Sequence, residues 1–118
     1  MNKADIYRKA AEIIVRDGQF KGELTSGGED ADALKDPSLP VCAIGACARA
    51  EYELYGTLPW ERPNGDPYDY AFRVGGEYSY NLSGVPRAIY YVNDDPRFGA
   101  EDIALVLKQR AAELDDAG

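Results

Sequence analysis

Three segments of the chain place apolar residues at helical spacing. The first covers residues 2–17 and begins with Asn2, a residue type that can cap a helix. Tyr7, Ala10 and Ile14 recur along one face of it. Gly18 follows directly and supplies the left-handed conformation that ends many helices. The pattern therefore predicts an N-terminal helix with one apolar stripe.

The second segment contains the stretch PVCAIGACARAEYELYG and predicts a helix over residues 39–55. Ser38 is the expected N-cap, Pro40 falls in the first turn, and Gly56 is the expected stop. Small residues at 43, 45, 46, 48 and 50 allow neighbouring backbones to approach closely. This composition indicates a helix at the centre of a small bundle.

The third segment predicts a helix over residues 100–114 near the C-terminus. Ile103, Val106 and Leu107 belong to its apolar stripe, which continues to Leu114. Acidic residues stand at 101 and 102, in the first turn, where the helix dipole favours negative charge.

Residues 19–39 join the first two helices and read as a long polar loop. The stretch TSGGEDADALKDPS is rich in Gly, Asp and Ser, which favour turns. A short helical turn around residues 30–34 is the one regular element that we expect there. A loop of this length is a candidate for mobility or partner contact.

Residues 57–85 form a connection rich in proline and tyrosine. Trp60 lies among three prolines, and we expect it to fold back onto the edge of the core. Two structures fit the following stretch. Asp66, Pro67 and Gly75 suit the N-cap, first position and end of a short helix, whereas alternating aromatic residues over 68–82 suit a β-hairpin.

Together these elements predict a mostly α fold in a single small domain spanning residues 1–118. It has three main helices, with one short β-hairpin as the alternative at 68–82. A chain of this length can bury a modest core without disulfides or metals.

Charge and composition narrow the function classes. The chain has 13 Lys plus Arg, 21 Asp plus Glu and a formal net charge of −8, which disfavours direct binding to nucleic-acid phosphates. No apolar run reaches the roughly 20 residues of a membrane span. The N-terminal segment is interrupted by charges where a secretory signal is apolar, so we expect no membrane association and a cytoplasmic location.

The chain contains no histidine, and this absence removes His-dependent catalysis and every His-containing metal site. The two cysteines, Cys42 and Cys47, are too few for a four-cysteine zinc site within one chain. Residues five apart in a helix have Cα atoms about 8.6 Å apart, beyond the roughly 7 Å that a disulfide tolerates. We therefore expect reduced thiols, no bound metal and no cofactor.

Cys42 permits two interpretations. It is expected in the first turn of its helix, where free N–H groups and the dipole can lower a thiol pKa. Its apolar neighbours instead favour a buried, structural cysteine, which is the interpretation we prefer.

Several of these motifs together resemble the DUF6197 family of small proteins from high-GC bacteria and their phages. They are ADIYRKAAEIIV followed by DGQFKGEL, then PVCAIGACARA, and finally VNDDPRFGAEDIALVLKQRAAE. The family pattern has Cys-Ala-x-Gly-Ala, matched here from Cys42 to Ala46, and Trp-Asn-Asp, matched at Asn93 and Asp94 with Val92 in place of Trp. The tyrosine-rich segment also looks longer than the usual family connection. The resemblance implies a mostly helical fold and an intracellular setting, and it adds no catalytic residue.

The Asn93-Asp94 pair follows a segment, residues 85–93, that predicts a short helix or an extended stretch. Asn-Asp-Asp-Pro is a good turn in its own right, because the short side chains bond nearby backbone groups. We expect a structural role for the pair and keep a functional role as the alternative.

These observations favour a small acidic interaction protein with a protein partner, acting on a host protein in the host cytoplasm if it is phage-encoded. The candidate interaction residues are aromatic: Trp60, Tyr68, Tyr70, Tyr78 and Tyr80. The alternative is a small enzyme or ligand-binding protein with a pocket between Cys42 and the Asn93-Asp94 turn.

Overall fold

The computed structural model describes residues 2–28, 30–61, 63, 65–76, 78–79 and 87–117, with the backbone alone at 68, 78, 79 and 117. The chain is mostly helical, as predicted. Its elements are α1 (Lys3–Asp17), α2 (Ala31–Lys35), α3 (Ala43–Tyr55), the 3-10 turn η1 (Pro59–Glu61), α4 (Pro67–Gly75), β1 (Tyr78–Ser79), β2 (Arg87–Ala88), α5 (Ile89–Asp94) and α6 (Ala100–Ala117).

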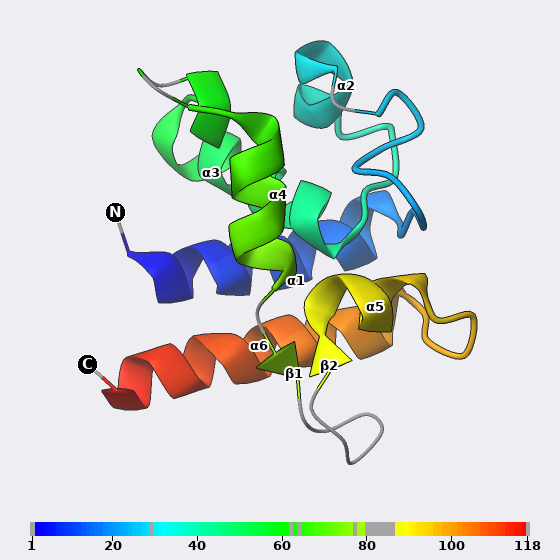
Figure 1. Cartoon of the computed structure of the whole chain (residues 1–118), viewed down its shortest axis with the longest axis vertical. Coiled ribbons are helices and arrows are strands. Elements are labelled where there is room, and N and C mark those ends of the chain that lie inside the picture. Colours follow the sequence, from blue (N-terminus) through cyan, green and yellow to red (C-terminus); the bar gives the residue numbers. More distant parts are fainter. Residues whose placement is uncertain are drawn as a thin grey trace.

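Helices α1 and α6 form the base of the fold and lie side by side in antiparallel directions (Figure 1). Helix α3 packs against α1, while α4 and α5 cover α3 from the other side. Ile13 and Ile14 of α1 and Leu107 of α6 are fully buried, as their apolar stripes require. One hydrophobic cluster includes buried residues from α1, α3, α4, α5 and α6.

The ends of α1 and α3 follow the sequence signals closely. The Asn2 side chain accepts hydrogen bonds from Ala4 N at 2.9 Å and Asp5 N at 3.3 Å, so it is the N-cap of α1. Gly18 ends α1 at a φ of 100°, and Gly56 ends α3 in the left-handed region at a φ of 89°. Both positions favour glycine because a Cβ strains this backbone conformation.

The predicted start of α3 was wrong, because the helix begins at Ala43 and not near Leu39. Ser38 does not cap it, since its N–H and hydroxyl both bond the Asp36 carboxylate, at 2.9 and 2.7 Å. Val41 forms single bridges with Gln19 and Thr25, which keep the backbone extended up to Cys42. Cys42 is therefore the N-cap residue and not part of the first turn.

The region of two alternatives contains a helix and then a strand. Residues 67–75 form α4, which confirms the helical alternative there. β1 pairs antiparallel with β2, with Tyr78 opposite Ala88 and Ser79 opposite Arg87. The hairpin alternative was therefore wrong, because residues 67–75 are helical and β1 pairs with a segment after residue 82. The predicted strand positions 80–82 lie outside the described residues.

The connection between α1 and α3 contributes to the core. Leu24, Thr25, Ala33 and Leu34 are buried, and the expected helical turn is present as α2. The structure therefore anchors this connection at several points, although its composition is typical of turns.

Arg49 of α3 is the largest fully buried side chain, and it holds this connection in place. Its guanidinium donates to the backbone oxygens of Ala33, Leu34 and Leu39 at 3.0, 2.6 and 2.8 Å. It also forms an ion pair of 3.0 Å with Asp17, whose side chain is 3% exposed. Arg49 thus caps the end of α2 and ties it to the end of α1.

Asp17 is ionised in this pair. Burial alone raises the pKa of its carboxyl, but hydrogen bonds and charge from Arg16 and Arg49 outweigh burial and lower the pKa below its ordinary value. The buried guanidinium therefore faces a full negative charge.

Arg49→Met is expected to lower the free energy of unfolding by about 3 to 5 kcal/mol, because it leaves three carbonyls without their donor and the buried Asp17 carboxylate with Arg16 as its remaining partner. Arg16→Met is the matched control. Arg16 pairs with the same carboxylate from a side chain that is 44% exposed, so its loss is expected to be below about 1 kcal/mol. Urea unfolding followed by circular dichroism measures both. Equal losses in the two variants would contradict the structural role of Arg49.

Candidate functional site

Asn93, near the end of α5, is 1% exposed, and its side chain bonds two distant segments of the chain. Its Oδ1 accepts from Ala43 N at 3.0 Å and from Gln19 Nε2 at 3.3 Å. Its Nδ2 donates to the Phe20 carbonyl at 3.0 Å. The side chain therefore links α5, the start of α3 and the segment after α1. The backbone partners lie 50 and 73 residues away in sequence, so the prediction that the Asn93 side chain bonds nearby backbone groups was wrong.

The next residue, Asp94, is held from the same segment. Its Oδ1 accepts from Gly22 N at 2.9 Å and from Asn93 Nδ2 at 3.2 Å. Lys21 adds a third tie, because its Nζ donates to the carbonyls of Asn93, Asp95 and Phe98 at 2.6, 2.8 and 3.0 Å. An ammonium at the carbonyl end of α5 is electrostatically favourable. Residues 19–22 and the turn after α5 therefore form one fixed unit.

The start of α3 packs against the same unit. Cys42 N donates to the Leu24 carbonyl at 3.1 Å, and the Cys42 Sγ accepts from Gly45 N at 3.3 Å. Gly45 is required here, because a Cβ on it would lie 2.4 Å from the Leu24 oxygen. Two N–H groups of the first turn, those of Ala43 and Gly45, are bonded to protein side chains. This helix end is therefore not built as an open anion site.

The Cys42 thiol is buried, and burial raises its pKa to about 11, although hydrogen bonds from backbone N–H groups oppose that effect. The nearby Asp94 carboxylate raises it further. Desolvation therefore outweighs the effect of the helix N-terminus, which on its own would lower the pKa of the thiol. Cys42 and Cys47 are both free and buried.

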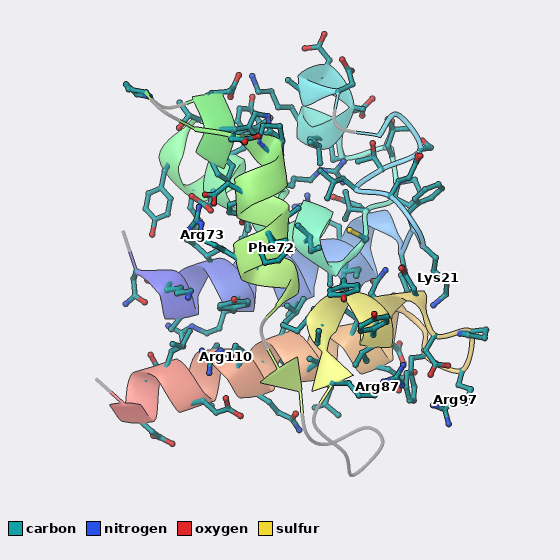
Figure 2. All side chains as sticks on the ribbon, in the orientation of Figure 1. Lys21, Phe72, Arg73, Arg87, Arg97 and Arg110 are labelled. Carbon is teal, nitrogen blue, oxygen red and sulfur yellow. The ribbon has the colours of Figure 1, made fainter. Side chains whose placement is uncertain are left out.

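Cys42, Asn93 and Asp94 all line one open cavity of about 990 Å³. Its walls come from residues 22–24, the start of α3, α4 and α5. Three aromatic residues line it and are also exposed: Phe72 at 86%, Tyr90 at 40% and Tyr91 at 55%. Figure 2 shows Phe72 on the outer face of α4. The structure therefore brings together the three candidate residues of the alternative hypothesis around a largely apolar space.

Comparison with known proteins gives one family. The family model described as "Family of unknown function (DUF6197)" matches residues 1–113. The chain belongs to the DUF6197 family. No curated protein and no solved structure matches it significantly.

In this DUF6197 chain the Cys-Ala-x-Gly-Ala segment has a physical explanation. Cys42 caps α3, Gly45 admits the Leu24 backbone, and Ala43 and Ala46 are fully buried. Asn93 reaches this segment through its bond to Ala43 N. The two motifs are thus parts of one packed unit, which also forms one wall of the cavity.

The aromatic candidates of the DUF6197 chain lie elsewhere. Trp60 is half-buried in η1 and packs edge-on against Tyr70, with ring centroids 5.8 Å apart. Tyr70 is 4% exposed, and burial raises the pKa of its phenol. Neither ring lines the cavity. The side chains of Tyr68 and Tyr78, and all of Tyr80, lie outside the described residues.

Sequence reasoning missed the aromatic residues that do line the cavity, Phe72, Tyr90 and Tyr91. The adjacent pair Tyr90-Tyr91 indicated an exposed aromatic ring, because two neighbouring large residues on a short helix cannot both face the core of the protein. Among the described residues there is no group of three or more metal-ligating side chains, and no helix long and apolar enough to cross a membrane.

Asn93→Ala is expected to destabilise the DUF6197 chain by about 2 to 4 kcal/mol, because the Ala43 N–H and the Phe20 carbonyl lose their partner. Asp94→Ala is the control, with an expected loss below about 1 kcal/mol, since its main partner is the exposed Gly22 N–H. Urea unfolding measures both. A loss for Asn93→Ala no larger than the control would show that the amide does not join the three segments.

Cys42→Ser is expected to change the pH dependence of stability while preserving the fold, since serine is itself a good N-cap. The folded state raises the thiol pKa from about 9 to about 11, so the stabilisation by the neutral thiol is complete below about pH 9 and is lost as pH rises through 11. The free energy of unfolding of the wild type should fall relative to Cys42→Ser by about 2 kcal/mol between pH 8 and 11. Parallel pH curves for the two proteins would contradict a buried, neutral thiol.

Proposed function

We propose that this protein is a non-catalytic binding protein that takes an apolar side chain of a protein partner into the cavity between α3, α4 and α5. The observation that carries the proposal is the exposure of Phe72, Tyr90 and Tyr91 around one open cavity. Exposed aromatic residues that gather at a hollow mark interaction sites more often than they stabilise the free protein.

The dimensions of the cavity support an inserted side chain. Its volume of about 990 Å³ lies at the upper end of the range for ligand pockets and exceeds any single side chain. Apolar groups such as Ile44 and Ala71 supply much of its surface. A partner that places a large apolar residue there would remove water from the three aromatic rings, and such buried anchors dominate interface energetics.

The chemistry of the same walls supports binding more than catalysis. The Cys42 thiol is protonated at neutral pH, because burial raises its pKa. Asn93 uses both its oxygen and its nitrogen in bonds that hold the fold. A polar group engaged in this way is a structural support and not a reacting atom.

The proposal includes a cytoplasmic setting, with a host protein as the partner if the chain is phage-encoded. Two buried free thiols suit a reducing compartment. The net charge of −8 keeps the protein apart from nucleic-acid phosphates and favours a partner of opposite charge.

Selection of short random-sequence peptides against the wild type tests the proposal. Peptides that enrich are expected to bind the double variant Phe72→Ala/Tyr91→Ala at least about tenfold more weakly, because it removes both exposed anchoring rings. The matched control is Val15→Ala/Leu105→Ala, whose side chains are 50% and 49% exposed on α1 and α6 and do not line the cavity. Calorimetric titration of individual peptides measures the affinities.

Three outcomes would overturn the proposal. One is the absence of any enriched peptide. Another is equal loss of binding in the cavity variant and the control. The last is a wild type that self-associates in sedimentation equilibrium while Phe72→Ala/Tyr91→Ala is monomeric, because the cavity face would then bind a second copy of this chain.

A further inference from the structure

We infer that the partner presents a cationic side chain, lysine or arginine, to Asp94 and to the tyrosine rings of α5, beside the apolar residue that enters the cavity. This inference rests on the proposed function and specifies the chemistry of the partner. It is carried by the Asp94 carboxylate, which the fold fixes at the cavity wall beside the tyrosine residues of α5 and which forms no ion pair with any residue that the structure describes.

The Asp94 carboxylate is positioned before any partner arrives. Its Oδ1 accepts from Gly22 N at 2.9 Å and from Asn93 Nδ2 at 3.2 Å, which sets the orientation of the group. Within the described part of the chain, no residue bonds its other oxygen, Oδ2. A fixed carboxylate with one oxygen available is a preorganised acceptor for an N–H donor of a ligand.

The basic residues near the cavity are already paired. Lys21 Nζ is held by three carbonyl oxygens, and Arg87, which lines the cavity, pairs with Asp95 at 3.0 Å. Arg97 pairs with the same carboxylate at 2.7 Å. Figure 2 shows Lys21, Arg87 and Arg97 gathered around the turn after α5, on a different side of the site from Phe72.

The acidic groups of the cavity are not neutralised in the same way. Glu23 lines the cavity beside Asp94, and it has no ion-pair partner among the residues that the structure describes. The cavity is lined by two acidic residues, Glu23 and Asp94, and one basic residue, Arg87, so its lining has a formal net charge of −1 in a protein whose total is −8. A cationic partner is steered toward such a site, and an anionic one is repelled.

The aromatic rings suit the same kind of group. Tyr90 and Tyr91 lie with their ring centroids 4.2 Å apart at an angle of 34°, and both line the cavity. The face of an aromatic ring attracts a cation through its quadrupole. Lysine and arginine also carry apolar stems, which suit the apolar part of the same cavity. A site with both aromatic rings and a carboxylate therefore favours a cationic side chain over a neutral apolar one.

The test uses the peptides selected against the wild type. Each is synthesised with its basic residue and with a neutral counterpart, citrulline for arginine and acetyl-lysine for lysine. Asp94→Asn is the decisive variant because it keeps the shape and the Oδ1 acceptor but removes the charge. Glu12→Gln is the matched control, since it changes the net charge equally from an exposed site on α1.

The expected result is a coupled loss. Asp94→Asn should weaken binding of the cationic peptides about tenfold, and the neutral counterparts should bind about as weakly to wild type as to Asp94→Asn. Glu12→Gln should change affinity by less than about twofold, and raising the salt concentration should weaken only the cationic peptides.

Each failure has a separate meaning. Peptides that need Phe72 and Tyr91 but contain no basic residue, or that bind equally with neutral counterparts, would overturn the cationic inference and leave the proposed function standing. Peptides that lose equal affinity in Asp94→Asn and Glu12→Gln would show a general field effect and also overturn it. The absence of any peptide that depends on the cavity would overturn both.

Discussion

The hydrogen bonds of the buried Asn93 amide are the constraint on which the site depends. The Asn93 side chain accepts a hydrogen bond from Ala43 N at the start of α3 and donates one to the Phe20 carbonyl after α1. The backbone oxygen of Asn93 accepts a hydrogen bond from Lys21 Nζ. A buried amide that meets all these groups is stabilising only if every partner stays in place, because each unmade bond leaves a polar group without water. The wall of the cavity is consequently rigid before any partner binds.

This arrangement also affects which charged groups face the cavity. The start of α3 faces the cavity, and helix N-termini commonly attract anions. Here Asn93 Oδ1 and Cys42 Sγ occupy the N–H groups of Ala43 and Gly45, so the positive end of the dipole is already partnered. The charged residues that remain at the wall are Asp94 and Glu23, together with Arg87, which is paired with Asp95, and aromatic rings lie among them. The structural bonds of the family motifs thus leave a site of acidic and aromatic character.

The elements that were predicted correctly from the sequence are those whose signals come from neighbouring residues. The stripe of α1, its Asn2 cap and the stop at Gly56 depend on neighbouring residues and were predicted correctly. The start of α3 depends on bridges from Val41 to Gln19 and Thr25, which no local pattern encodes. Arg49 reads as a surface residue of an amphipathic helix, yet it is fully buried because Asp17 and three carbonyls converge on it. A pocket between Cys42 and the Asn93-Asp94 pair was an alternative from the sequence, and the tertiary structure was needed to show that these residues line one cavity.

The exposed aromatic residues, unlike the buried residues above, are not explained by the packing of the fold. Gly75 of α4 packs closely against α3, because a Cβ there would lie 2.8 Å from Ile44 Cδ1 and the Ile44 side chain would have to shift. Phe72, one turn earlier on the same helix, is 86% exposed and contributes almost no buried area to the core. A polar residue at that position would satisfy the fold equally well and would remove an apolar group from water. The fold therefore explains the glycine but not the phenylalanine, and the exposure of Phe72 is the observation that our proposal of a protein partner accounts for.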